Sequence, residues 1–107
     1  MTNLEYEQQL AQRLLFGPVV LEIHVADPAF FSYVDGVFSD SSCHTGPVNH
    51  AVVAIGFTRD YWIIQNSWGP GWGEKGYMRI KRGSTLCGVG LNWLQPMDFA
   101  VTIAPGQ

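Results

Sequence analysis

The chain has 107 residues and a formal net charge of −3, with 47% hydrophobic and only 14% charged residues. This is the length of one domain, and we expect residues 1–107 to form a single unit. The lack of a basic excess argues against nucleic-acid binding. No apolar run reaches the roughly 18 residues of a membrane-spanning helix. Four Trp, four Tyr and six Phe in so short a chain predict apolar surface that a partner covers.

The first segment carries the signals of an amphipathic helix. Thr2 and Glu5 have the spacing of a capping box, and apolar residues recur at helical spacing as far as Leu14. Gly17-Pro18 would stop the helix, which we therefore expect over roughly residues 3–15. Acidic and amide side chains stand where a signal peptide needs an apolar core, so no export signal is expected in this segment.

Strand patterns dominate the remainder of the chain. In the first of them Glu22 and His24 share the polar face of an alternating run, and an aromatic cluster follows between Phe30 and Phe38. One helix with several antiparallel strands predicts an α+β domain built on a curled antiparallel sheet or open barrel. The expected strands are residues 19–25, 50–57, 61–66 and 76–82, with the apolar stretch 99–103 as a further segment that could pair back into the sheet.

Two local patterns are interpreted as structural. Arg79-Ile80-Lys81-Arg82 alternates along a strand and is predicted to be a solvated edge rather than a basic patch. Gly71 to Gly76 spells G-x-G-x-x-G, which in a dinucleotide site lies between a strand and a helix. Here the motif precedes a strand, so we interpret its glycines as turn residues with Trp72 packed among them.

A histidine and an asparagine carry the possible chemistry. His50 opens one predicted strand and Asn66 closes the next, and a tight turn between the two strands would bring these ends together. An amide oxygen can hold one imidazole nitrogen and leave the other for proton transfer. Trp68 could cover that hydrogen bond and exclude water. Taken alone, such a pair is more often structural than catalytic.

The wider sequence closely resembles the papain-like cysteine peptidases. The resemblance rests on Asn49-His50-Ala51-Val52 and on the run from Tyr61 to Tyr77, YWIIQNSWGPGWGEKGY, and extends to Gly17-Pro18, Tyr33-x-x-Gly36, Cys87-Gly88 and Pro96. It covers nearly the whole chain. It implies the C-terminal half of that fold, a β-barrel-like domain that faces a helical N-terminal domain across the active-site cleft.

The resemblance also implies roles for individual residues. His50 corresponds to the catalytic base and acid, Asn66 orients its imidazole, and Trp68 shields the pair and contributes to the leaving-group side of the cleft. The family's nucleophile lies in a Gln-x5-Cys-x-x-Cys-Trp type of segment, whose Gln helps to stabilise the oxyanion, and nothing here resembles that segment. Cys43 and Cys87 match cysteines that form a disulfide in the family.

The cysteine and histidine side chains could also be interpreted as ligands of a metal ion. Cys43, His44, His50 and Cys87 include zinc-ligand types, but their spacing fits none of the usual ligand pairs. No metal and no cofactor is expected.

Substrate-binding positions are implied by the same resemblance. Val48, Glu22 and Asn92 match positions that line the pocket for the second residue before the scissile bond, and Asn49 and Trp68 are assigned to substrate binding with them. The wall position that Glu22 occupies is usually apolar, so we hypothesise a polar pocket that tolerates a basic side chain. The alternative is that a local shift of the strand turns Glu22 toward solvent.

Together these patterns predict a peptidase domain that contributes His50 and Asn66 and is inactive alone. The expected partners are an N-terminal domain or light chain that carries the nucleophile, peptide or protein substrates, and cystatin-like inhibitors, in a lysosomal or extracellular setting. Two alternatives stay open, a non-catalytic binding module and a truncated gene product. Whether the native product begins at Met1 separates them.

Overall fold

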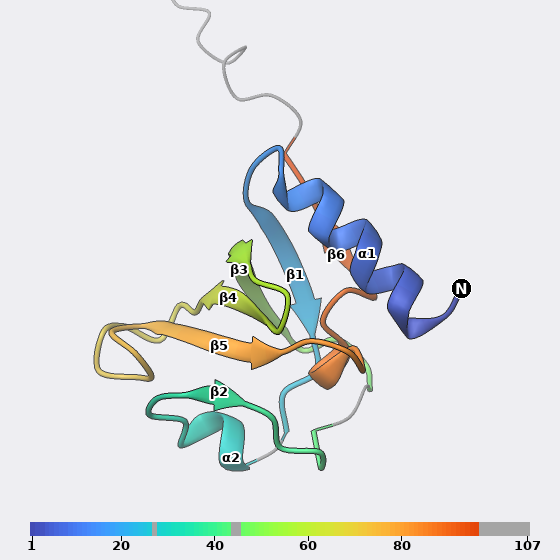
Figure 1. Cartoon of the computed structure of the whole chain (residues 1–107). Coiled ribbons are helices and arrows are strands. Elements are labelled where there is room, and N and C mark those ends of the chain that lie inside the picture. Colours follow the sequence, from blue (N-terminus) through green and yellow to red (C-terminus); the bar gives the residue numbers. More distant parts are fainter. Residues whose placement is uncertain (27, 44–45, 97–107) are drawn as a thin grey trace, which may run out of the picture.

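The computed structural model describes residues 1–26, 28–43 and 46–96 (Figure 1). The predicted pairing of residues 99–103 lies outside the described residues. In chain order the elements are α1 (Asn3–Leu14), β1 (Val19–Ile23), α2 (Pro28–Phe31), β2 (Val37–Phe38), β3 (His50–Phe57), β4 (Tyr61–Gln65), β5 (Tyr77–Lys81), the 3-10 helix η1 (Leu86–Gly88) and β6 (Trp93–Leu94).

Helix α1 begins at the predicted capping box. The Thr2 hydroxyl accepts the Glu5 N–H at 3.2 Å, and the Glu5 carboxylate accepts the Thr2 N–H at 2.8 Å. The Thr2 hydrogen bonds hold the pKa of Glu5 below its usual value. Two residues after Glu5, buried Glu7 accepts hydrogen bonds from the backbone N–H groups of Gly83 and Thr85 at 2.7 and 2.8 Å. A buried carboxylate thereby joins the helix to the loop before η1.

The sheet has six strands in the order β2-β5-β4-β3-β1-β6. Every pair of neighbours is antiparallel except β2 and β5, which are parallel. The predicted α+β class, with a helix and an open, mainly antiparallel sheet, is therefore confirmed, and the parallel pairing of β2 with β5 makes the sheet mixed. The chain reaches β2 by way of α2 rather than through a hairpin, so β2 arrives alongside β5 in the same direction (Figure 1).

Two further expectations need correction. The Arg79 to Arg82 stretch is not an edge of the sheet, because Val37–Phe38 pairs with Arg79 and Ile80 on the side away from β4. Strand β1 ends at Ile23 rather than near residue 25. The next N–H group, that of His24, donates to the carbonyl of Cys87 at 3.0 Å, so the chain leaves the sheet toward η1.

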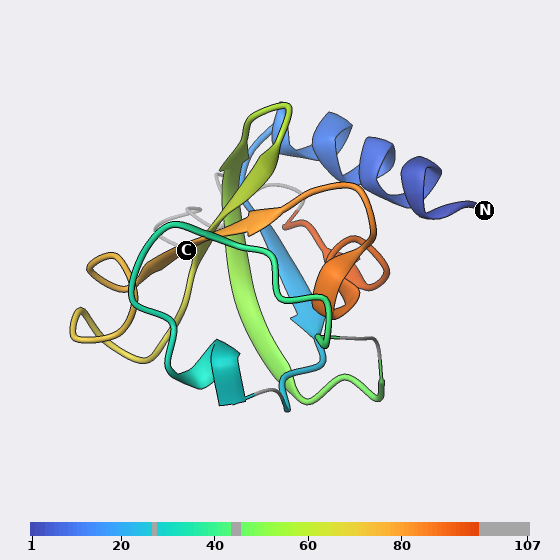
Figure 2. The ribbon, with the colours of Figure 1, turned by 60° about the horizontal axis from the view of Figure 1, so that its bottom comes forward.

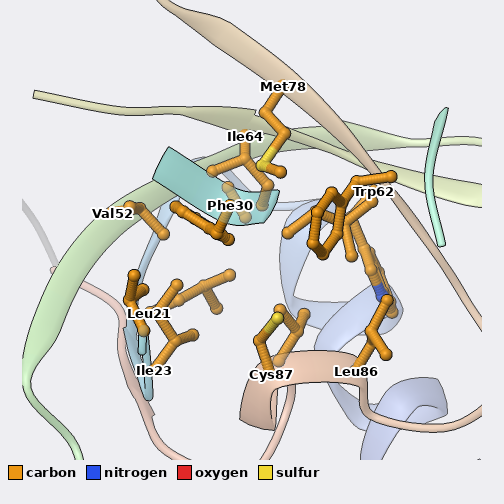
Figure 3. Close-up of a cluster of buried hydrophobic side chains, with 14 of the residues drawn as sticks. Leu21, Ile23, Phe30, Val52, Trp62, Ile64, Met78, Leu86 and Cys87 are labelled. Carbon is orange, nitrogen blue, oxygen red and sulfur yellow. The ribbon is translucent and has the colours of Figure 1, made fainter. Parts of the chain in front are cut away.

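The core lies on one face of this curled sheet. Alternate side chains of four strands point inward and meet Phe30 of α2 and Cys87 of η1 (Figure 3). Each fully buried side chain of this size contributes about 1.5–3 kcal/mol of transfer free energy. The strand residues concerned are Leu21, Ile23, Val52, Trp62, Ile64 and Met78.

The opposite face, here called the outer face, is less completely covered. Leu94 is 66% exposed and Ile55, at a bulge in β3, is 43% exposed. Val20 pairs with both Leu94 and Val53, and Val53 pairs with Gln65, so one row of side chains crosses four strands. The outer face consists of Val20, Glu22, Ala51, Val53, Ile55, Gln65, Tyr77 and Leu94.

Candidate functional site

His50 and Asn66 meet where the inward-facing rows of β3 and β4 end. His50 continues the row of Val52, and Asn66 continues the row of Ile64, because alternate residues of a strand share a face. The antiparallel pairing of the two strands places these ends side by side. His50 Nε2 lies 2.9 Å from Asn66 Oδ1. The predicted approach of the two residues is thus present.

The hydrogen bond defines which imidazole nitrogen is available. Asn66 Oδ1 also accepts the N–H of Ser67 at 2.7 Å, which holds the amide oxygen toward the ring. Nε2 therefore donates to Asn66, and Nδ1 remains for proton transfer. Within the described residues, Nδ1 makes no hydrogen bond. Asn66 itself is buried, whereas His50 is half-buried at the surface.

Trp68 covers the imidazole. The two ring centroids are 4.9 Å apart and the planes are inclined by 30°. Phe31 lies against Trp68 almost parallel, at 5.3 Å and 12°, and Trp72 meets the same indole edge-on at 5.2 Å. The sequence singled out the aromatic cluster but assigned it no function. Phe31 and Trp68 belong to segments that are far apart in the sequence, so no local sequence pattern predicts their contact.

The loop that carries Trp68 is fastened to α2 at its far end. Trp72 is buried, and its indole N–H donates to the carbonyls of Phe30 and Phe31 at 3.2 and 3.1 Å. Gly73 has φ +62°, and a Cβ there would stand 2.6 Å from the carbonyl of Tyr77. Only glycine fits so close an approach. The glycine run is a turn that leads into β5, as predicted, and not a dinucleotide motif.

A charged pair closes the same loop. The Glu74 carboxylate accepts two hydrogen bonds from Arg79, at 2.7 and 3.0 Å, and a third from the N–H of Gly36 at 3.1 Å. The Arg79 hydrogen bonds hold the pKa of Glu74 below its usual value, and the pair raises the pKa of Arg79. This clamp was not foreseen. It ties the loop between β4 and β5 to the turn before β2.

Of the predicted substrate-binding residues, Glu22 and Asn92 lie beside each other at the outer face, whereas Val48 lies in the loop before β3. Glu22 is exposed on the outer face directly opposite Ala51, and its N–H donates to the carbonyl of Asn92 at 3.0 Å. Ala51 was not assigned a role, although it follows His50 and shares the face of Glu22. Glu22 therefore lies between Ala51 on one side and Asn92 on the other. Val48, 46% exposed, precedes β3.

Asn49 uses its side chain within the fold. Its amide oxygen accepts the N–H of Val25 at 2.8 Å, and its amide nitrogen donates to the carbonyl of Val25 at 2.9 Å. Its own N–H donates to the carbonyl of Ile23. Asn49 thereby fastens the strand start that carries His50, and its predicted contact with substrate stays a prediction.

The two cysteines of the chain are bonded to each other. Cys43 and Cys87 form a disulfide that joins the loop before β3 to η1, with the Cα atoms 5.1 Å apart. The disulfide implied by the resemblance is confirmed. Because the sequence contains only these two cysteines, neither offers a free thiol to His50 and Asn66.

Residues 1–26, 28–43 and 46–96 contain no cluster of three or more metal-ligating side chains. His44, one of the residues weighed as a zinc ligand, lies outside the described residues. No described helix combines the length and the hydrophobicity needed to cross a membrane.

Comparison with known proteins gives the same answer from sequence and from shape. The profile described as "Papain family cysteine protease" matches residues 1–97. Pro-cathepsin H of Bos taurus is 50% identical over 81 residues, and "Germination-specific cysteine protease 1" of Arabidopsis thaliana is 37% identical over 103 residues. These matches cover 70% and 88% of this chain but only 24% and 27% of the relatives.

Among solved structures, the Carica candamarcensis cysteine protease CMS1MS2 in complex with E-64 superimposes with a TM-score of 0.75 and 45% sequence identity. That match covers 81% of this chain and 42% of the other. The chain thus spans less than half of the proteins that it resembles. On this evidence it belongs to the papain family of cysteine proteases.

Proposed function

We propose that this chain supplies the His–Asn part of a Cys-His-Asn site that hydrolyses peptide bonds, and that another domain supplies the cysteine. The observation that carries the proposal is the oriented pair of His50 and Asn66 beneath Trp68. Both cysteines of the chain are in the disulfide, so neither serves as the nucleophile. The thiol-bearing domain belongs either to a longer form of the same protein or to a separate chain.

The chemistry follows from the free nitrogen of His50. A thiol beside Nδ1 transfers its proton to the ring, and the resulting ion pair favours the thiolate. The thiolate attacks the peptide carbonyl, and as the C–N bond breaks the imidazolium protonates the departing amine. Water then attacks the thioester while the neutral ring accepts a proton, and the C–S bond breaks to release the carboxylic acid product and restore the thiolate. Asn66 holds the ring in position through both steps.

The outer face supports the need for a partner domain. It presents Ile55, Tyr77 and Leu94, which are 43%, 38% and 66% exposed, to solvent. Large apolar side chains exposed on one face are typical of a protein–protein contact. We assign this face to the thiol-bearing domain, which would also complete the cleft.

For the substrate we propose a pocket that accepts a basic side chain two residues before the scissile bond. Glu22, Ala51 and Asn92 lie together, and the small Ala51 side chain leaves room beside the carboxylate. In the chain as described, Glu22 faces solvent, so an N-terminal domain has to close this pocket. A peptide library applied to the assembled enzyme tests the assignment. Glu22→Gln should lower the preference for Arg, whereas a strict preference for bulky apolar residues in the unaltered enzyme would contradict it.

A lysosomal or extracellular site of action accords with the disulfide, since such bonds persist in oxidising compartments. For inhibitors of the cystatin type, the cleft around Trp68 is the proposed contact.

Reconstitution tests the function directly. The chain, a papain-family N-terminal domain with an intact cysteine, and an equimolar mixture of the two are assayed on a fluorogenic peptide. We expect turnover only in the mixture, and none when the chain carries His50→Ala. Turnover by the chain alone would contradict the proposal. Stable association with no turnover in a mixture whose cysteine reacts with E-64 would instead favour a non-catalytic binding module.

A further inference from the structure

A groove between helix α1 and strand β6, here called the α1–β6 groove, has no part in the proposed reaction. Its volume is about 380 Å³, which lies in the range of roughly 300–1,000 Å³ that is usual for ligand-binding pockets. Its lining residues are Gln9, Gln12, Arg13, Phe16 and Trp93. The first three lie on one face of α1, and Phe16 follows at the same spacing just after the helix ends.

The two walls of the groove are fixed relative to each other. Trp93 pairs with Leu21, so its side chain lies on the inner face of the sheet, half-buried next to α1. The side-chain amide of Gln95 donates to the carbonyls of Arg13 and Gly17 at 2.8 and 3.2 Å. These hydrogen bonds fasten the chain after β6 to the end of the helix, so the groove is preformed in the folded chain.

The groove is separated from the His50 site. Figure 2 shows α1 beside the end of β3 that leads into β4, whereas His50 begins β3 at the opposite end of that strand. A ligand in the α1–β6 groove therefore leaves the imidazole open to substrate.

Arg13 gives the groove a positive charge. Its guanidinium lies over the Trp93 ring, with Cζ 5.9 Å from the ring centroid. Within the described residues the guanidinium takes part in no ion pair and no hydrogen bond, and none of the described lining residues is acidic. Its fork of N–H groups is available to a carboxylate. The amides of Gln9 and Gln12 offer donors and acceptors beside it.

The aromatic residues add an apolar part to this charged site. Phe16 is 81% exposed, and with Trp93 it provides two rings against which a third ring can pack. A polyanionic glycan would gain little here, because a single cation lines the groove. One carboxylate next to one aromatic side chain complements both the guanidinium and the rings.

We propose that the α1–β6 groove binds a segment of a partner protein in which Asp or Glu adjoins an aromatic residue. The carboxylate binds Arg13, and the aromatic ring packs against Phe16 and Trp93. The site tethers the partner outside the His50 site, so binding there does not depend on the proposed function.

Titration of the 107-residue chain with blocked peptides tests the ligand chemistry. The probes are acetyl-Gly-Phe-Asp-Gly-amide and its Phe-Asn and Ala-Asp counterparts, and the indole N–H resonance of Trp93 is followed by NMR. We expect a saturable shift with the Phe-Asp peptide and an affinity roughly three- to tenfold lower for each of the other two. Equal affinity for the Phe-Asp and Phe-Asn peptides, or no saturable shift, would overturn the proposal.

Substitutions in the chain locate the binding site. Arg13→Gln and Phe16→Ala should each weaken binding of the Phe-Asp peptide by roughly three- to tenfold. The matched controls, Arg59→Gln and Leu15→Ala, remove exposed side chains that do not line the groove and should leave the affinity unchanged. Equal losses in the test and control variants would overturn the proposal. His50→Ala should bind the peptide normally, which separates this test from that of the proposed function.

The same titration distinguishes two other occupants. The sequence itself contains Asp98-Phe99, so the peptide is also titrated into a chain that carries both Asp98→Asn and Phe99→Ala. Tighter binding by this variant would place the chain's own segment in the groove and overturn the assignment to a partner, whereas unchanged affinity supports it. Displacement of the peptide by an equimolar heparin tetrasaccharide, lost in Arg13→Gln, would favour a glycan and overturn it likewise.

Discussion

The two faces of the curled sheet differ in how far this chain completes them. On the inner face, side chains from four strands, α2 and η1 close around one another and leave almost nothing exposed (Figure 3). On the outer face Ile55 and Leu94 remain open to solvent. The candidate functional residues divide in the same way. His50 and Asn66 extend the inner rows, whereas Glu22 and Ala51 stand on the outer face.

The difference between the two faces explains why the surroundings of His50 are defined within this chain, whereas those of Glu22 are not. The imidazole takes its orientation from Asn66 and its cover from Trp68, and both belong to this chain. Nothing on the outer face fixes the surroundings of Glu22 in the same way. We infer that proton-transfer geometry is built into this chain, while substrate selection before the scissile bond awaits a second domain.

Truncating the same residue type on each face tests whether the inner face is packed more tightly than the outer face. Ile64→Ala removes a fully buried side chain and should lower the free energy of unfolding by about 2–5 kcal/mol. Ile55→Ala, on the outer face, should change it by less than about 1 kcal/mol. Chemical denaturation of the isolated chain measures both. Similar losses in the two variants would mean that the outer face is already packed.

The disulfide should rank next. It closes a sequence separation of 44 residues, for which removal costs about 2–4 kcal/mol. Replacement of both Cys43 and Cys87 by Ser avoids leaving a free thiol and should lower the midpoint of thermal unfolding. An unchanged midpoint would show that the loop before β3 is held without the bond.

The clamp between Glu74 and Arg79 should have a smaller, pH-dependent effect. The ordinary pKa of the Glu74 carboxyl group is near 4.5, and the Arg79 hydrogen bonds lower this pKa in the folded chain. The contribution of the clamp is therefore complete above about pH 4.5 and is lost as the pH falls through the folded-state pKa. Because solvent screens this partly exposed pair, Glu74→Gln should lower the free energy of unfolding by no more than about 1 kcal/mol at pH 7. It should also make stability less sensitive to acid. An equally steep acid dependence in the variant would contradict this assignment.

Introducing a charged side chain on the outer face should have the smallest effect. It should weaken the binding of the thiol-bearing domain without changing the stability of the fold. Ile55→Glu should weaken binding of the thiol-bearing domain by about tenfold, because an apolar contact is replaced by an unpaired charge. Isothermal calorimetry measures the affinity, and a denaturation curve close to that of the unaltered chain confirms that the fold is intact. Unchanged affinity would place the partner on another surface.

Much of this account was predictable from local patterns. The capping box of Thr2 and Glu5, the strand positions and the approach of His50 to Asn66 follow from spacing and alternation. The parallel pairing of β2 was not predictable, because a two-residue strand has no period to detect. Neither was the stack of Phe31 on Trp68, since the two residues are 37 positions apart in sequence and only the tertiary fold brings them together.

We propose that His50 acts as the acid and base for a thiol outside this chain. The most direct measurement is the single-turnover acylation rate of the assembled enzyme, with the native chain and with His50→Ala at equal occupancy. We expect the acylation rate to fall at least about 10³-fold in the variant, as when a triad member is removed. A fall of less than tenfold, with the variant folded and bound to its partner domain, would contradict it.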